Sequence, residues 1–157
     1  MSAGTWESHN AITTLMYRYV ECVDAADFDG IASLFEHGRI TNEGVEGAIE
    51  GPAAVKALYV NTNRVHADGT LRTRHLTTNI IVEINEVSGT ATARSAFMVF
   101  QQTADLPLQP IVGGRYRDTF QRDGAGWRFE CRHILVDQVG DVREHLKFDL
   151  ADFIDKH

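Results

Sequence analysis

The chain has 157 residues, of which 43% are hydrophobic and 24% are charged, so its composition excludes collagen-like, coiled-coil and wholly disordered classes. This length suits one ordinary domain, and we expect a single domain over residues 1–157. The formal net charge of -7 repels phosphate backbones and argues against a nucleic-acid partner.

Two further classes are disfavoured by the distribution of residues. No apolar run approaches the roughly 20 residues that span a bilayer, and the N-terminus MSAGTWESHN lacks the basic start and apolar stretch of a signal peptide. We therefore expect a cytoplasmic protein with no membrane partner. Cys22 and Cys131 have no CxxC or HxxxH motif nearby, so neither a disulfide framework nor a zinc site is signalled.

The first predicted element is a helix that starts near Ser8 and ends near Asp24. Its apolar residues recur at the spacing of a helix with one buried face. They are Ile12, Leu15, Met16, Tyr19 and Val23.

Two shorter helices are predicted next. Asp27 is placed to cap a second helix, which Gly38 ends. Short extended pieces fit residues 39–41 and 48–50. A third helix opens at Pro52, because proline suits the first helical position, where its missing N–H has no partner to lose.

From residue 73 onward the hydrophobic period changes to two, which predicts β-strands. Four long strands are expected, at residues 73–84, 90–102, 111–122 and 127–137. The breaks at 85–89 and 123–126 indicate antiparallel hairpins, whereas 103–110 contains two prolines and predicts a wider loop. Helices followed by strands indicate an α+β fold, with the helices on one face of a curved antiparallel sheet. A last helix is expected in the tail, at residues 142–154.

His75 is the first candidate functional residue, near the start of the first long strand. Its neighbours on the same face, Thr73, Thr77 and Asn79, are small or polar, unlike the apolar face of a packed core strand. This polar lining predicts a cavity beside His75. The residues alone also allow a hydrogen-bonded structural histidine.

Asp24 is the second candidate, on the edge of the apolar face of the first helix. By itself such a carboxylate also fits a solvated or helix-capping role. If the helices cover the sheet, however, the end of this helix can reach the strand that bears His75. An aspartate that accepts from one ring nitrogen of the histidine would leave the other nitrogen as a base.

Four stretches carry a resemblance to a known family. They are RYVECVDAADFDGIASLF (18–35), TRHLTTN (73–79), GGRYRDTFQRDGAGWRF (113–129) and GDVREHL (140–146). Together they resemble the SnoaL-like branch of the nuclear transport factor 2-like superfamily, which includes scytalone dehydratase, bile acid dehydratase and hexachlorocyclohexane dehydrochlorinase. The β subunits of ring-hydroxylating dioxygenases lie close by. The resemblance implies a cone: a curved mixed or antiparallel sheet wrapped around the N-terminal helices, with an apolar pocket inside.

The resemblance also implies roles for individual residues. Asp24 and His75 match a dyad in which histidine is the general base and aspartate orients it. Tyr19 matches a pocket tyrosine of some dehydratases, although its helical spacing is also typical of a core residue. The second histidine of scytalone dehydratase has no counterpart, since Gln101 is nearest to its position, so a melanin-type substrate is not expected. We expect the substrate-binding residues to be Phe97, Val99, Tyr116 and Phe120.

The leading functional hypothesis is a cofactor-free lyase or isomerase. In it, His75 removes a proton from a small, mostly apolar ring compound, aromatic or polycyclic, while Asp24 holds the imidazole tautomer. Loss of water or halide, or migration of a double bond, then follows. The sequence has no metal motif, glycine-rich phosphate loop or nucleophile elbow, so we expect no metal and no cofactor. The alternatives are a non-catalytic subunit like the dioxygenase β chain and a small-molecule binding protein.

We also expect a homodimer or a homotrimer. The outer face of a half-covered sheet needs a partner to cover its apolar residues. To this face we assign Ile80, Val82, Met98 and Ile134.

The roles of two residues in the middle of the last predicted strand stay open. His133 shares the parity of Phe129 and Cys131, which is typical of a buried structural histidine. Arg132 either forms an ion pair with a neighbouring acidic residue such as Asp118 or anchors an anionic substrate.

Overall fold

The computed structural model describes residues 3–150 of the chain. In chain order, its elements are α1 (Ala3–Asp24), α2 (Phe28–Leu34), β1 (Arg39–Asn42), β2 (Ile49–Glu50), α3 (Gly51–Thr62), β3 (Thr73–Asn85), β4 (Thr90–Gln101), β5 (Gln109–Asp123) and β6 (Gly126–Val139). The helices precede the long strands, which confirms the predicted α+β class.

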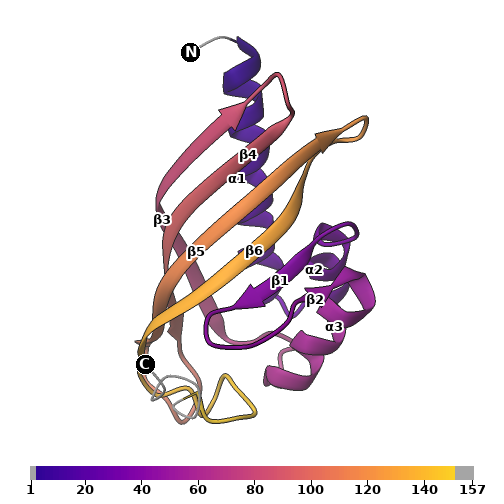
Figure 1. Ribbon diagram of the computed structural model, residues 1–157. Helices are drawn as coiled ribbons and strands as arrows, with labels where there is room; N and C mark the ends of the chain where they lie inside the picture. Colours follow the sequence, from indigo (N-terminus) through magenta and orange to yellow (C-terminus); the bar gives the residue numbers. More distant parts are fainter. Residues whose placement is uncertain (1–2, 151–157) are drawn as a thin grey trace.

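The strands form one six-stranded sheet in the order β2-β1-β6-β5-β4-β3. Strands β3, β4, β5 and β6 pair antiparallel with one another, whereas β1 joins β6 in parallel, so the sheet is mixed. Figure 1 shows α1 running along one face of this curved sheet, with α2 and α3 packed beside β1 and β2. No helix in the described part of the chain is both long and apolar enough to cross a membrane.

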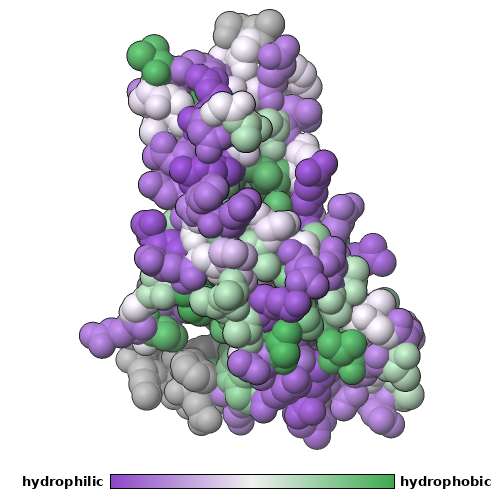
Figure 2. Space-filling model, turned by 90° about the vertical axis from the view of Figure 1, so that its right-hand side faces the viewer, coloured by the Kyte–Doolittle hydropathy of each residue, from purple (hydrophilic) through white to green (hydrophobic). Residues whose placement is uncertain are grey.

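The first three predicted helices form where the sequence places them, although α1 begins five residues before Ser8. The Asp27 carboxylate accepts a hydrogen bond from the backbone N–H of Gly30 at 2.8 Å and so caps α2. Pro52 lies in the first turn of α3. The apolar faces of α1 and α3 meet the concave face of the sheet in the core, whereas hydrophilic side chains predominate on the face shown in Figure 2.

A β-bulge in β3 changes which residues face the core. The register of β3 against β4 shifts between Thr78 and Ile81, and Asn79 has a φ of 54°. Because one extra residue reverses the parity of the strand, Ile80 and Val82 pack against the core while Ile81 is exposed. The predicted place of Ile80 and Val82 on the outer face is therefore wrong, and Asn79 is exposed.

A second irregularity affects β6. Phe129 pairs with Phe120, but Cys131 pairs with Thr119, so an extra residue lies between them. Phe129 stays in the core, whereas His133 turns to the outer face, where its Nδ1 lies 2.7 Å from the Thr41 hydroxyl. The predicted shared face of His133 and Phe129 is therefore wrong.

The same shift places one more residue differently from expectation. Ile134 pairs with the buried Tyr116 and packs against the core, so its predicted place on the outer face is wrong. Of the four residues assigned to that face, Met98 remains there, opposite Leu76 of β3.

The predicted C-terminal helix is not formed where the structure describes it. Residues 140–150 make turns and one isolated bridge, between Asn63 and Leu146. The backbone N–H of Lys147 donates to the Thr62 carbonyl instead of continuing a helical ladder. The remainder of the predicted helix, residues 151–154, lies outside the described residues.

Candidate functional site

The fold brings Asp24 and His75 into direct contact. Asp24 ends α1, which packs on the first residues of β3, and the Nδ1 atom of His75 lies 2.5 Å from Oδ1 of Asp24. The side chains of His75 and Asp24 are only 8% and 18% exposed, respectively. The contact is therefore largely shielded from water, which strengthens it.

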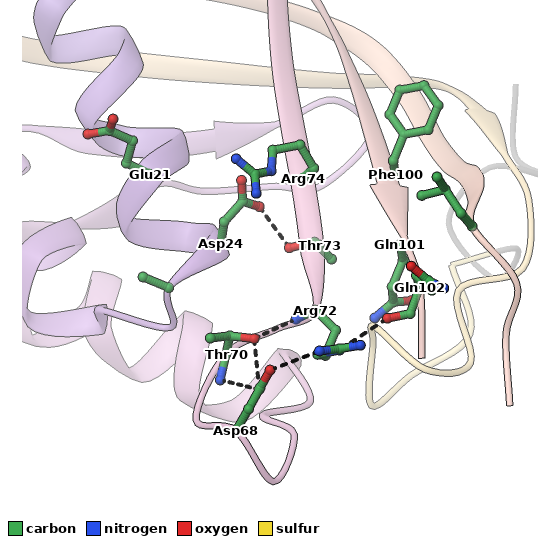
Figure 3. A pocket seen from close by; sticks show the side chains of 12 residues that line it. Glu21, Asp24, Asp68, Thr70, Arg72, Thr73, Arg74, Phe100, Gln101 and Gln102 are labelled. Atoms are coloured by element: carbon green, nitrogen blue, oxygen red, sulfur yellow. Dashed lines mark hydrogen bonds and ion pairs between the residues drawn. The ribbon is translucent and has the colours of Figure 1, made fainter. Parts of the chain in front are cut away.

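Further donors from the start of β3 hold the Asp24 carboxylate. The Thr73 hydroxyl donates to Oδ1 at 2.7 Å, as Figure 3 shows, and the backbone N–H of His75 donates to Oδ2 at 3.0 Å. Burial raises the pKa of Asp24, but the hydrogen bonds from His75 and Thr73 outweigh burial and lower this pKa below its ordinary value. Asp24 is thus an anion at neutral pH.

This arrangement selects one tautomer of neutral His75. Because the Asp24 carboxylate can only accept, the proton of the neutral ring resides on Nδ1, and Nε2 carries the free electron pair. Within residues 3–150, no hydrogen bond engages Nε2. An oriented imidazole with an available Nε2 is the geometry that a general base needs.

Tyr19 lies in a buried group of tyrosines and makes no hydrogen bond to the dyad. Its hydroxyl bonds the hydroxyl of Tyr59, and its ring packs edge-to-face against Tyr116. Burial raises the pKa of Tyr19 and places the pKa values of Tyr59 and Tyr116 well above the ordinary value. All three phenols stay protonated and can act as donors.

The structure assigns Arg132 to an ion pair, as the sequence allowed. Its guanidinium binds both carboxylate oxygens of Asp118, at 2.9 and 2.8 Å, with neither side chain exposed. Tyr19 and Tyr116 lie against the guanidinium, with ring centroids 4.2 and 3.9 Å from its central carbon. Burial opposes the charge of Arg132, but the Asp118 carboxylate outweighs burial and raises the pKa of the guanidinium.

The four residues expected to line a pocket are all buried in the core: Phe97, Val99, Tyr116 and Phe120. Phe97 stacks on Tyr116 with ring centroids 4.4 Å apart. This stacking depends on Gly114, because a Cβ there would lie 2.7 Å from the Phe97 ring. These side chains therefore belong to the packed hydrophobic core, and none of them lines the open cavity near the dyad.

An open cavity of about 580 Å³ borders the dyad from the other side. Figure 3 shows it between the end of α1, the start of β3 and the end of β4. Its wall includes Asp24 and Thr73 of the dyad network, together with Arg72 and Arg74. Most of the residues that line the cavity are polar or charged, and the cavity meets the dyad through Asp24 and not through the His75 ring.

Two residues were not singled out by sequence reasoning. Tyr59, on α3, is the hydroxyl partner of Tyr19. His145 lies next to the His75 ring, at 6.2 Å between ring centroids. No sequence signal points to His145, because its position depends on how the segment after β6 folds back. Among residues 3–150, no group of three or more His, Cys, Asp or Glu side chains is placed to hold a metal ion.

Curated proteins similar to this chain are dioxygenase β subunits. The benzene 1,2-dioxygenase subunit beta of Pseudomonas putida is 35% identical over 79 residues, which cover 49% of this chain and 42% of that protein. The biphenyl 2,3-dioxygenase subunit beta of Rhodococcus jostii is 32% identical over 79 residues. The chain thus matches less than half the length of these relatives.

Solved structures share the fold over most of the chain. An NTF2-like protein with a cystatin-like fold from Novosphingobium aromaticivorans aligns with a TM-score of 0.70 and 27% identity, over 84% of this chain and 83% of that chain. A protein of unknown function from Mycobacterium tuberculosis aligns with a TM-score of 0.70 and 26% identity, over 87% and 75% of the two chains. A further Novosphingobium aromaticivorans protein, provisionally assigned as a scytalone dehydratase, aligns with a TM-score of 0.70 at 21% identity, over 90% and 91% of the two chains, and shows the fold alone.

The family follows from a match to most of the sequence. The pattern that defines the SnoaL-like domain matches residues 4–133. This range includes the Asp24–His75 dyad, the three buried tyrosines and the first half of β6 with Arg132. The chain belongs to the SnoaL-like domain family, within the NTF2-like superfamily.

Proposed function

We propose that this protein is a cofactor-free lyase or isomerase that abstracts a proton from a small, mostly apolar cyclic substrate. The observation that carries the proposal is the 2.5 Å contact between His75 Nδ1 and Asp24 Oδ1, which leaves Nε2 as the basic atom. A solvated aspartate would need neither the Thr73 hydroxyl nor the backbone N–H of His75 as donors. Three donor groups on one carboxylate favour a fixed orienting role.

The reaction begins when His75 Nε2 accepts a proton from a ring carbon next to an electron-withdrawing group. The C–H electron pair moves into the ring system, and the Asp24 carboxylate stabilises the imidazolium that forms. In an elimination, the bond to hydroxide or halide at the next carbon then breaks, and the leaving group takes the bonding electrons. In an isomerisation, the imidazolium returns the proton to a different carbon.

The tyrosine group supports the apolar part of the proposal. Negative charge that develops on the substrate is stabilised by donors in a low-dielectric site, and the phenols of Tyr19, Tyr59 and Tyr116 are buried donors. Burial is the main cause of the raised pKa of Tyr116, and the Asp24 carboxylate adds a smaller upward effect. Aromatic rings packed around these donors favour a flat, apolar substrate.

Proton abstraction can be tested before the physiological substrate is known. A panel of mono- and bicyclic ketones is incubated with the protein in D₂O, and the loss of ring C–H signals is followed by ¹H NMR. His75→Ala and Asp24→Asn are expected to slow the exchange by at least about 100-fold. His133→Asn, on the outer face of the sheet, is the matched control and should exchange like the parent.

Two outcomes contradict the proposal. If the parent catalyses exchange and both dyad variants match it while melting normally, another group is the base. If the parent binds members of the panel but exchanges none of them, the small-molecule binding function is favoured.

A second candidate function is a structural subunit of a larger oxygenase. The observation in its favour is the 35% identity to a dioxygenase β subunit over 79 residues. Copurification with a ring-hydroxylating α-type partner, retained in the His75→Ala variant, would support it. A stable homo-oligomer that exchanges ring protons favours the enzyme instead.

A further inference from the structure

The segment after β6 brings a second histidine to the dyad. His145 is 6% exposed, and its ring meets the His75 ring at 6.2 Å between centroids with a 68° angle between their planes. This is an edge-to-face contact. The reaction described above gives His145 no role.

The position of His145 is fixed from two directions. Gln101, at the end of β4, donates through Nε2 to the carbonyls of Leu71 and Glu144, each at 3.0 Å. His66 Nε2 donates to the same Glu144 carbonyl at 2.8 Å, and the backbone N–H of Arg64 donates to the His145 carbonyl at 2.8 Å. The backbone on both sides of the His145 ring is therefore anchored.

We infer that His145 is a positioning residue for His75, an inference that rests on the proposed function. Asp24 holds the Nδ1 edge of the His75 ring, and the edge-to-face contact with His145 opposes rotation of that ring about its χ2 bond. The terminal torsion of histidine has broad minima, so a hydrogen bond at one edge leaves the ring free to rock. Two contacts from different elements fix Nε2 in one direction.

The ring of His145 remains uncharged in this position. Burial, and then the electrostatic effect of His75, lower the pKa of His145 to about 3, against an opposing effect from Asp24. His66 is the other ionisable neighbour that lowers the pKa of His145. Glu144 and Arg64 contact the His145 segment through the backbone hydrogen bonds described above. The imidazolium that forms on His75 therefore meets no second cation.

The contact acts through packing and not through a hydrogen bond. Nδ1 of His145 is buried and has no hydrogen-bond partner within residues 3–150. A flat neutral ring without this nitrogen should therefore replace histidine, whereas a small side chain should not.

The first test reads the His75–Asp24 hydrogen bond without any substrate. In ¹H NMR, the proton between Nδ1 and the carboxylate is expected as a resolved low-field signal in the parent, in His145→Phe and in His133→Asn. His133→Asn is the matched control, because it removes a histidine on the outer face of the sheet, where it bonds Thr41 and not the His145 segment. In His145→Ala the mobile ring should broaden this signal, and His145→Leu carries the test if the alanine variant does not fold. A signal as sharp in both variants as in the parent would overturn the inference.

Turnover provides the second test, with any ketone that the parent exchanges. We expect kcat to fall at least about tenfold in His145→Ala with KM nearly unchanged, and to be restored in His145→Phe. His133→Asn should leave kcat unchanged. Equal kcat in the parent and in His145→Ala, or a loss in His145→Ala that His145→Phe does not restore, would overturn the inference.

The parent protein alone gives a third test. The ring signals of His145 should stay those of neutral imidazole from about pH 8 to pH 5, where an ordinary histidine changes charge. Protonation of His145 in that range would overturn the inference. If the signal tests succeed while no dyad variant alters turnover, the positioning stands and the proposed function fails.

Discussion

Asp24 links the chemistry of the site to the stability of the fold. Its pKa is lowered in the folded protein, so folding favours the carboxylate over the protonated acid. The corresponding stability is present above the unfolded pKa of about 4 and is lost as the pH falls through the folded pKa.

Asp24→Asn should therefore remove part of the acid sensitivity of the protein. We expect the difference in the free energy of unfolding between parent and variant to shrink as the pH falls from about 5 toward 2. Urea denaturation at several pH values measures it. Because Asp68, Asp123 and Asp141 also have lowered pKa values, only the difference between the two proteins isolates Asp24. A difference that is constant with pH would contradict the assigned hydrogen bonds.

The Tyr19 and Tyr59 hydroxyls form a buried pair whose members depend on each other. Tyr59→Phe leaves the Tyr19 hydroxyl without its partner, which should cost about 1–2 kcal/mol of unfolding free energy. Removing both hydroxyls should cost less than the sum of the two single changes, because the second change removes an already unpaired group. Urea denaturation of the two single variants and the double variant measures this coupling, and strict additivity would argue against the bond.

At the scale of elements, the bulge in β3 rests on one residue. Asn79 adopts a φ of 54°, a conformation that glycine and asparagine tolerate and β-branched residues do not. Asn79→Val should destabilise the fold by about 1–2 kcal/mol, while Asn79→Gly should stay within about 0.5 kcal/mol of the parent. Thr78→Val, one residue earlier and exposed in the strand, is the control. Equal melting temperatures for Asn79→Val and the control would show that the bulge does not depend on this residue.

The elements themselves were predictable because their signals are local. The hydrophobic period of 3.6 before Asp24 identifies α1, and the period of two after Thr73 identifies β3. Because helices cover one face of the sheet, the end of α1 then meets the start of β3. The bulges were not predictable in this way. One extra residue at Asn79 moves every later side chain of β3 to the opposite face of the sheet, yet polar and apolar residues still alternate on either side of it. His145 escaped prediction for a related reason: its contact with His75 follows from long-range hydrogen bonds between loops.

At the scale of the whole molecule, the outer face of the sheet carries exposed apolar side chains. Leu76 is 45% exposed and Ile81 is 48% exposed on β3, and Met98 lies opposite Leu76 on β4. Burying this patch between copies would remove it from water. We therefore keep the expectation of a homodimer or homotrimer, with the patch as part of its interface.

A charge placed in the patch tests the assembly. Leu76→Lys should shift a dimer or trimer toward monomer at micromolar concentration, as measured by sedimentation velocity. The monomeric variant should still be able to exchange ring protons. Arg74→Lys on the same face of β3 keeps the charge and should not change the assembly. A parent protein that sediments as a monomer would contradict the expectation.

The bulge has one more consequence, which concerns the border of the sheet. β3 is the outermost strand on its side, and a straight strand of 13 residues would offer a long row of unpaired backbone groups to a strand of another molecule. Asn79 interrupts that row near its middle and twists the strand there. The residue that fixes the parity of β3 thus also protects the folded chain from edge-to-edge aggregation.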